Sequence, residues 1–151
     1  MTRVDERCPP HGRDWDYRGG MQVLSSRVLL RPADLDVAVD FYEDRLGLVR
    51  YREWGSPPHR GIVYFLGGGH LELTETPPGR SAPDAPRGLR LWLQVADVAA
   101  TCDELAGRGV DIVEPPERKP WGLIEAVIHD PDGLILVLIE TPLDHPLRRR
   151  E

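Results

Sequence analysis

The segment RVLLRPADL at residues 27–35 has a near copy 63 residues further along the chain, RLWLQVADV at residues 90–98. In both copies a short, mostly apolar run is followed by an Ala-Asp pair, after which apolar residues recur at helical spacing. A short apolar run is typical of a strand, and an aspartate before a helical apolar stripe is typical of a helix N-cap. The repeat therefore predicts two copies of a strand followed by a helix.

Each copy continues with three more strand-like runs. The first copy predicts strands at residues 24–31, 48–54, 61–66 and 70–75 and a helix from about Asp34 to Leu46. The second predicts strands at residues 89–95, 110–113, 122–129 and 134–140 and a helix from about Asp97 to Arg108. The repeat extends to the last strands, because ELTE at 72–75 corresponds to VLIE at 137–140. We predict an α+β protein of two βαβββ modules with mixed, largely antiparallel sheets.

The segments between and around the two copies differ from them in composition. Residues 76–87, TPPGRSAPDAPR, are rich in Pro, Gly and Ser, as linkers are. Residues 1–20 are polar and show no periodicity. The expected organisation is a polar extension at 1–20, a first module at 21–75, a linker at 76–87, a second module at 88–141 and a tail at 142–151.

Charge and composition disfavour two classes of partner. Asp and Glu outnumber Lys and Arg by 25 to 19, and the resulting net charge of −6 repels nucleic acid and anionic lipid. No apolar run approaches the roughly 18 residues that a membrane span requires, and residues 1–20 lack the apolar stretch of a signal peptide. The two cysteines, Cys8 and Cys102, form no disulfide framework or zinc pattern. We expect a cytoplasmic protein that binds neither nucleic acid nor a membrane.

The repeat also carries short strings that identify a resemblance. These strings are ADLD at 33–36, FY at 41–42, LGL at 46–48 and DPDG at 130–133. With the duplicated βαβββ pattern, they resemble the vicinal oxygen chelate superfamily, which includes glyoxalase I, extradiol dioxygenases and the bleomycin resistance proteins. The resemblance covers about residues 24–141. It implies an open U-shaped sheet with the helices on its outer face.

In members of that superfamily that use a metal, the first and last strands of each module supply the ligands. The resemblance places Arg27 and Glu72 at these positions in the first module, and Arg90 and Val137 in the second. Only Glu72 has a suitable donor, because a guanidinium offers no lone pair and valine offers nothing. A pair formed by His70 and Glu72 would be too few ligands. We therefore expect no metal and no other cofactor.

Side-chain alternation nevertheless predicts a ligand-facing wall. On the strand at 89–95, Leu91, Leu93 and Val95 point to one face, and Arg90, Trp92 and Gln94 point to the other. A cation, an indole and an amide are suited to orienting a small ligand. We predict a ligand site formed by Arg27, Glu72, Arg90, Trp92 and Gln94. An Arg-Glu ion pair that fills the former metal site is the alternative role for Arg27 and Glu72.

The resemblance favours a metal-free protein that binds a small organic molecule, anionic or aromatic, and sequesters an antibiotic or a metabolite. We also expect a homodimer, with the modules paired within one chain or exchanged between two. Two enzyme hypotheses remain open: a lyase, isomerase or oxygenase that uses a divalent metal, and a metal-free enzyme. In the metal-free enzyme Glu72 would act as general base and Arg90 would stabilise negative charge.

Overall fold

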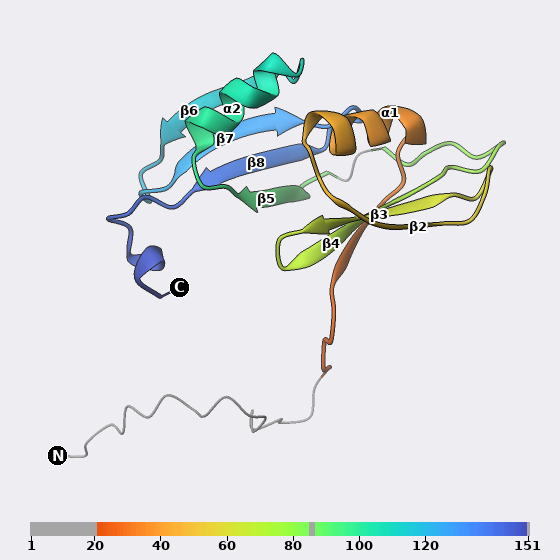
Figure 1. Cartoon of the computed structure of the whole chain (residues 1–151), viewed down its shortest axis with the longest axis horizontal. Coiled ribbons are helices and arrows are strands. Elements are labelled where there is room, and N and C mark those ends of the chain that lie inside the picture. Colours follow the sequence, from red (N-terminus) through yellow and green to blue (C-terminus); the bar gives the residue numbers. More distant parts are fainter. Residues whose placement is uncertain (1–20, 85–86, 151) are drawn as a thin grey trace.

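The computed structural model describes residues 21–84 and 87–150, so Cys8 and the predicted extension at 1–20 lie outside the described residues. The first half contains β1 (Arg27–Leu30), α1 (Leu35–Val39), η1 (Asp40–Arg45), β2 (Arg50–Trp54), β3 (Gly61–Leu66) and β4 (Gly69–Thr74) (Figure 1). The second half contains β5 (Arg90–Gln94), α2 (Val98–Gly107), β6 (Ile112–Arg118), β7 (Ile124–His129), β8 (Ile135–Glu140) and η2 (Pro146–Arg150). The predicted α+β class with two βαβββ modules is confirmed.

The two sheets have the same topology. Their strand orders are β1-β4-β3-β2 and β5-β8-β7-β6, with a parallel first pair and antiparallel pairs elsewhere. Arg27 lies opposite His70 in the first sheet, and Arg90 lies opposite Ile135 in the second. The sequence repeat is therefore also a repeat of strand register.

Both helices begin where the aspartates predicted them. The Asp34 carboxylate accepts hydrogen bonds from the backbone N–H groups of Asp36 and Val37, and that of Asp97 accepts one from Ala100. Such caps satisfy helix N–H groups that have no partner within the helix. In the first half the helix widens into the π-helical turn η1 and ends before Gly47, whose φ is 74°.

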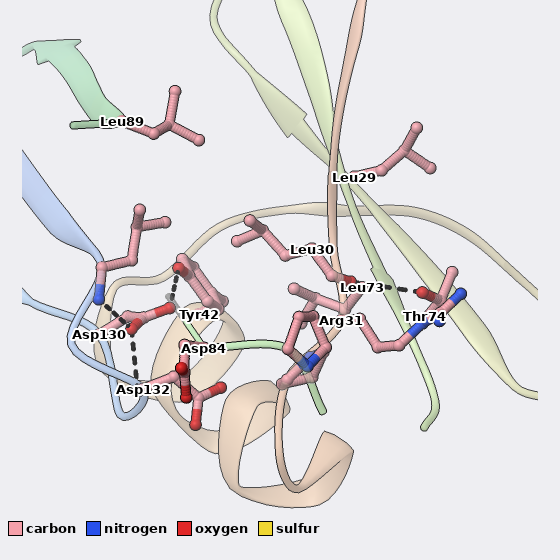
Figure 2. A pocket seen from close by; sticks show the side chains of 13 residues that line it. Leu29, Leu30, Arg31, Tyr42, Leu73, Thr74, Asp84, Leu89, Asp130 and Asp132 are labelled. Carbon is pink, nitrogen blue, oxygen red and sulfur yellow. Dashed lines mark hydrogen bonds between the residues drawn. The ribbon is translucent and has the colours of Figure 1, made fainter. Parts of the chain in front are cut away.

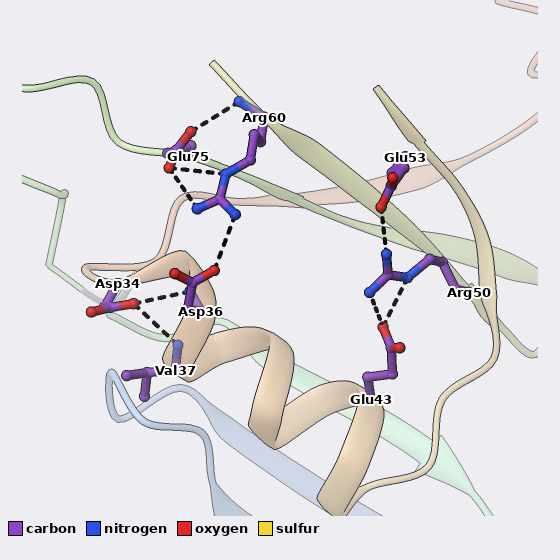
Figure 3. A network of polar contacts seen from close by, with 8 residues as sticks. All are labelled: Asp34, Asp36, Val37, Glu43, Arg50, Glu53, Arg60 and Glu75. Carbon is purple, nitrogen blue, oxygen red and sulfur yellow. Dashed lines mark hydrogen bonds and ion pairs between the residues drawn. The ribbon is translucent and has the colours of Figure 1, made fainter. Parts of the chain in front are cut away.

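Ion pairs fasten this first helix to its sheet (Figure 3). Arg60, at the start of β3, contacts Asp36 of α1 at 3.1 Å and Glu75 at 2.7 Å. Arg50 of β2 contacts Glu43 of η1 at 2.6 Å and also pairs with Glu53. The helix is thus held on one face of the sheet.

The two modules share one core. Buried side chains from the first helix, such as Phe41, belong to the same apolar cluster as Val98 and Leu105 of α2. Polar contacts cross the same junction, because the Tyr42 hydroxyl donates to Asp130 at 2.8 Å and the backbone N–H of Ala33 donates to Asp132 at 3.1 Å. The helix-covered sides of the modules therefore pack together.

One strand differs clearly from its prediction. The run at 110–113 predicted a short strand, but β6 extends to Arg118 and passes through Pro115 and Pro116. Because β6 is an edge strand that pairs with β7 alone, a proline without an N–H costs it little.

Among the described helices, none has the length and apolar character needed to cross a membrane.

Candidate functional site

Glu72 is the most deeply buried acidic side chain in the described residues, with a relative exposure of 6%. It lies on the face of β4 that points away from α1. The Arg27 guanidinium donates to its Oε2 at 2.5 Å, and the Trp54 indole N–H donates to its Oε1 at 3.0 Å. A buried carboxylate needs such partners, because burying an unpaired charge is costly. Both oxygens of Glu72 are therefore engaged within the protein.

Trp54 reaches Glu72 across a glycine. Gly61 lies opposite Trp54 in the β2–β3 pair, and a Cβ atom at Gly61 would lie 2.1 Å from Cε2 of the indole. The ring therefore occupies space that any other residue at position 61 would fill. This close approach explains why a large aromatic side chain can lie against the sheet there.

Three more rings extend this face beyond Glu72. Tyr51 lies 4.9 Å from Phe65 and 5.2 Å from His70 between ring centroids, and Phe65 lies 5.6 Å from His70. Nδ1 of His70 is buried and has no hydrogen-bond partner among the described residues. His70 thus packs in an aromatic group, which we call the aromatic face: Tyr51, Trp54, Phe65 and His70.

The two faces of β5 in the second module differ in exposure. Along β5, Arg90, Trp92 and Gln94 are exposed and Leu91 is buried, as the alternation predicted. Trp92 keeps 54% of its surface accessible. Arg90 forms no ion pair with any residue in 21–84 or 87–150, in contrast to Arg27. The two equivalent arginines therefore differ, since one is neutralised and the other is free to meet a ligand anion.

A cavity of about 490 Å³ lies beside this wall. Trp92 and Gln94 line it together with Phe65 and the β3–β4 turn at Gly67 and Gly68. Of the predicted residues, Arg27 and Glu72 are in contact with each other, and Trp92 and Gln94 share this cavity. Arg90 lines none of the cavities found in the described part of the chain.

The sequence analysis missed the roles of Trp54, Tyr51 and Phe65. Strand parity held a usable signal, because Gly61, Val63 and Phe65 alternate on one face of β3 opposite Thr74, Glu72 and His70. The small residue at position 61 marks where a neighbouring ring can lie down. Cys102 of α2 is a core residue, since it is 5% exposed and burial raises the pKa of its thiol.

The residues that the resemblance places at the ligand positions do not fit a metal ion. The guanidinium groups of Arg27 and Arg90 have no lone pair to offer a metal, Val137 lies opposite Trp92 as an apolar neighbour, and Glu72 is engaged by Arg27 and Trp54. Elsewhere in the described residues, no three His, Cys, Asp or Glu side chains cluster closely enough to hold a metal ion.

Two βαβββ modules, each with a four-stranded mixed sheet, have the fold of glyoxalase-like proteins. The chain belongs to the glyoxalase/bleomycin resistance protein/dioxygenase superfamily, whose profile matches residues 25–138.

Proteins similar to this chain include some named as enzymes and one named as a binding protein. A probable lactoylglutathione lyase of Synechocystis sp. is 32% identical over 121 residues, covering 75% of this chain and 92% of the relative. A lactoylglutathione lyase of Haemophilus influenzae is 28% identical over 127 residues, covering 80% and 93%. Among solved structures, TnmS3, an antibiotic binding protein from Streptomyces sp. CB03234, has a TM-score of 0.64 and 26% identity, covering 82% of this chain and 100% of TnmS3.

Proposed function

We propose that the protein is a metal-independent binding protein for a small aromatic anion. The observation that carries this proposal is the engagement of Glu72 by Arg27 and Trp54. It turns the one candidate metal ligand into part of an ion pair. An ion pair beside aromatic rings is suited to binding rather than to activating a metal-bound group.

Arg90 and Trp92 supply the expected ligand preference. A free guanidinium binds carboxylate or phosphate in a bidentate manner, and an exposed indole offers flat area for stacking. Gln94 adds a donor and an acceptor beside the cavity that it shares with Trp92 and Phe65. The ligand extends from this cavity along β5 to Arg90. The antibiotic-binding relative TnmS3 supports a role in sequestration.

The functional unit that we propose is a homodimer. The aromatic face of one protomer covers the β5 wall of its partner, which accounts for the large exposed rings of Tyr51, Phe65 and Trp92. Exposed apolar patches of this kind mark interaction surfaces or ligand grooves. The cytoplasmic location expected from the sequence remains a prediction that cell fractionation tests.

The ligand preference is tested with matched aromatic probes. 1-Naphthoate should bind more tightly than 1-naphthylmethanol, because only the carboxylate pairs with Arg90. Arg90→Gln should weaken naphthoate binding by about tenfold and leave the alcohol unchanged, whereas Trp92→Ala should weaken both through lost stacking area. Binding is measured by calorimetry. Arg80→Gln, a change of another exposed arginine, serves as the control, and equal losses in Arg80→Gln and Arg90→Gln would contradict the proposal.

Metal independence is tested separately. Dialysis against EDTA should leave both the melting temperature and naphthoate binding unchanged, because a true metal site stabilises the fold by mass action and loses that effect on chelation. Metal content is measured by mass spectrometry before and after dialysis. Stoichiometric Zn, Ni, Fe or Mn whose removal lowers the melting temperature would overturn the proposal.

An enzyme remains the second candidate because the Synechocystis relative is named a probable lactoylglutathione lyase. The test is a lactoylglutathione lyase assay with and without added Ni²⁺ or Zn²⁺. Activity that depends on metal would favour the metal enzyme, and metal-free activity abolished by Glu72→Gln would favour Glu72 as general base. The engagement of both Glu72 oxygens favours an inactive result in each assay.

A further inference from the structure

A second cavity lies where the two modules meet. Its volume is about 490 Å³, within the range of small-molecule sites. Its lining comes from the end of β1, the β1–α1 connection, η1, the end of β4, residues 83–84, Leu89 just before β5, and the β7–β8 turn (Figure 2). None of Arg27, Glu72, Arg90, Trp92 and Gln94 lines it, so this cavity is distinct from the site proposed above.

Three carboxylates line this junction cavity, from Asp84, Asp130 and Asp132. Asp130 accepts the backbone N–H groups of Asp132 at 2.9 Å and Leu134 at 2.8 Å, and the hydroxyl of Tyr42 at 2.8 Å. Asp132 accepts the N–H of Ala33 at 3.1 Å. These donors are all neutral, so the hydrogen bonds orient the carboxylates without cancelling their charge.

No ion pair within the described residues neutralises these three carboxylates. Arg31 is the single cationic side chain in the lining, where three carboxylates outnumber it. Burial and the nearby Asp130 and Asp132 carboxylates raise the pKa of the Tyr42 phenol far above its ordinary value. The floor of the cavity is therefore at negative potential.

The remaining walls are apolar. Leu29, Leu30, Leu73, Leu89 and Leu134 line the cavity with two prolines. A hydrated metal ion gains nothing from such walls, and no metal-ligating cluster exists among the residues described. An organic cation gains from both parts of the lining, since its charged end meets carboxylates while its hydrocarbon body leaves water.

We propose that the junction cavity is a second binding site, for a small organic cation such as a protonated amine or amidine on an apolar body. The charged end lies between Asp84 and Asp132, whose carboxylates carry no cationic partner among the described residues. The apolar body lies against the leucines of β1 and β4. Occupancy of this site bridges the two modules, because Asp132 lies in the second module and Asp84 in the segment between the modules, whereas Leu29 and Leu73 lie in the first module.

The proposal is tested with three probes of matched shape on the isotopically labelled full chain. The probes are 2-phenylethylamine, which is protonated at neutral pH, neutral 2-phenylethanol and anionic 3-phenylpropanoate. Titration by NMR should show the ammonium binding at least about tenfold more tightly than the alcohol, and the anion not binding. The shifted resonances should include Thr74, Asp132 and Leu134, and should spare Trp92 and Gln94.

Variants assign the charge recognition. The double variant Asp84→Asn with Asp132→Asn should lose the preference for the ammonium, and asparagine at 132 keeps an acceptor for the N–H of Ala33. Asp103→Asn, a change of an exposed aspartate on α2, should keep the preference. Equal binding of ammonium and alcohol, an unchanged preference in the double variant, or shifts centred on Trp92 would overturn the proposal. Because the naphthoate assay reads β5 and this one reads the junction, either proposal can fail without the other.

Discussion

At the scale of single residues, Glu72 shows how a buried carboxylate is satisfied by two neighbouring side chains. An arginine at position 27 brings a counter-charge to the buried carboxylate, and the indole of Trp54 satisfies its second oxygen. In the second module Val137 lies at the position that corresponds to Glu72, so Arg90 has no carboxylate there to pair with. The same residue type thus serves stability in one module and is available for recognition in the other.

Gly61 controls this arrangement, because the indole of Trp54 occupies the space of its missing side chain. Gly61→Ala should push the ring away from β3 and break its hydrogen bond to Glu72. Loss of a hydrogen bond to a charged group should reduce the free energy of unfolding by about 1.5 to 3 kcal/mol. The measurements are urea denaturation and the NMR signal of the Trp54 indole N–H.

The matched control is Gly68→Ala in the β3–β4 turn, where a Cβ would meet nothing within 4 Å. Trp54→Phe should remove the same hydrogen bond, so that the double variant with Gly61→Ala costs little more than either single change. Fully additive losses would show that Gly61 does not act through Trp54.

At the scale of elements, the sequence predicted both helices and all eight strands in their observed order. The helix starts were predictable because Asp34 and Asp97 cap them locally, and the β5 faces because alternation is a local property. The π-helical turn η1 and the extension of β6 through Pro115 and Pro116 were not predictable. Both depend on tertiary neighbours, namely the packing of Phe41 and Tyr42 and the edge position of β6.

The ion pair between Arg60 and Glu75 makes a pH-dependent contribution to the free energy of unfolding. Glu75 accepts hydrogen bonds from the Arg60 side chain at 2.7 and 3.1 Å and from its backbone N–H at 3.1 Å. The Arg60 guanidinium and N–H hold the pKa of Glu75 below its ordinary value of 4.5. A carboxyl with a lowered pKa in the folded state stabilises the protein above its unfolded value and loses that effect as the pH falls.

Glu75→Gln should therefore destabilise the protein near neutral pH, and the difference from the native chain should shrink as the pH falls through the folded-state pKa. Urea denaturation at neutral pH and well below pH 4.5 measures both values. Glu104→Gln, on the exposed side of α2, should give no difference at either pH. If the loss of stability in Glu75→Gln instead grew as the pH fell, the proposed role of the Arg60–Glu75 pair would be wrong.

At the scale of the whole molecule, the repeat predicted two modules but not how they dock. The junction depends on contacts between distant segments, such as Tyr42 with Asp130 and Ala33 with Asp132, and neither strand parity nor helical spacing encodes such pairs. For the same reason only part of the candidate site could be predicted from the sequence. Parity placed Trp92 and Gln94 correctly on one face, but the ring contacts of Tyr51, Phe65 and His70 emerge only when β2, β3 and β4 are adjacent.

The homodimer makes a prediction about which chains build one site. No cavity among the described residues joins Tyr51 with Arg90 within one chain. If a protomer covers the β5 wall of its partner with its aromatic face, each site takes Tyr51 from one chain and Arg90 from the other. Tyr51→Ala and Arg90→Gln should then each weaken naphthoate binding at every site when either variant is measured alone, by about tenfold for Arg90→Gln. When the two variants are unfolded together and refolded, half of the sites in each mixed dimer are intact, so random pairing restores about a quarter of all sites. Calorimetry on the mixture measures the restored fraction, and light scattering confirms the dimer. Sites formed within one chain would restore nothing, because every site would then carry one of the two defects.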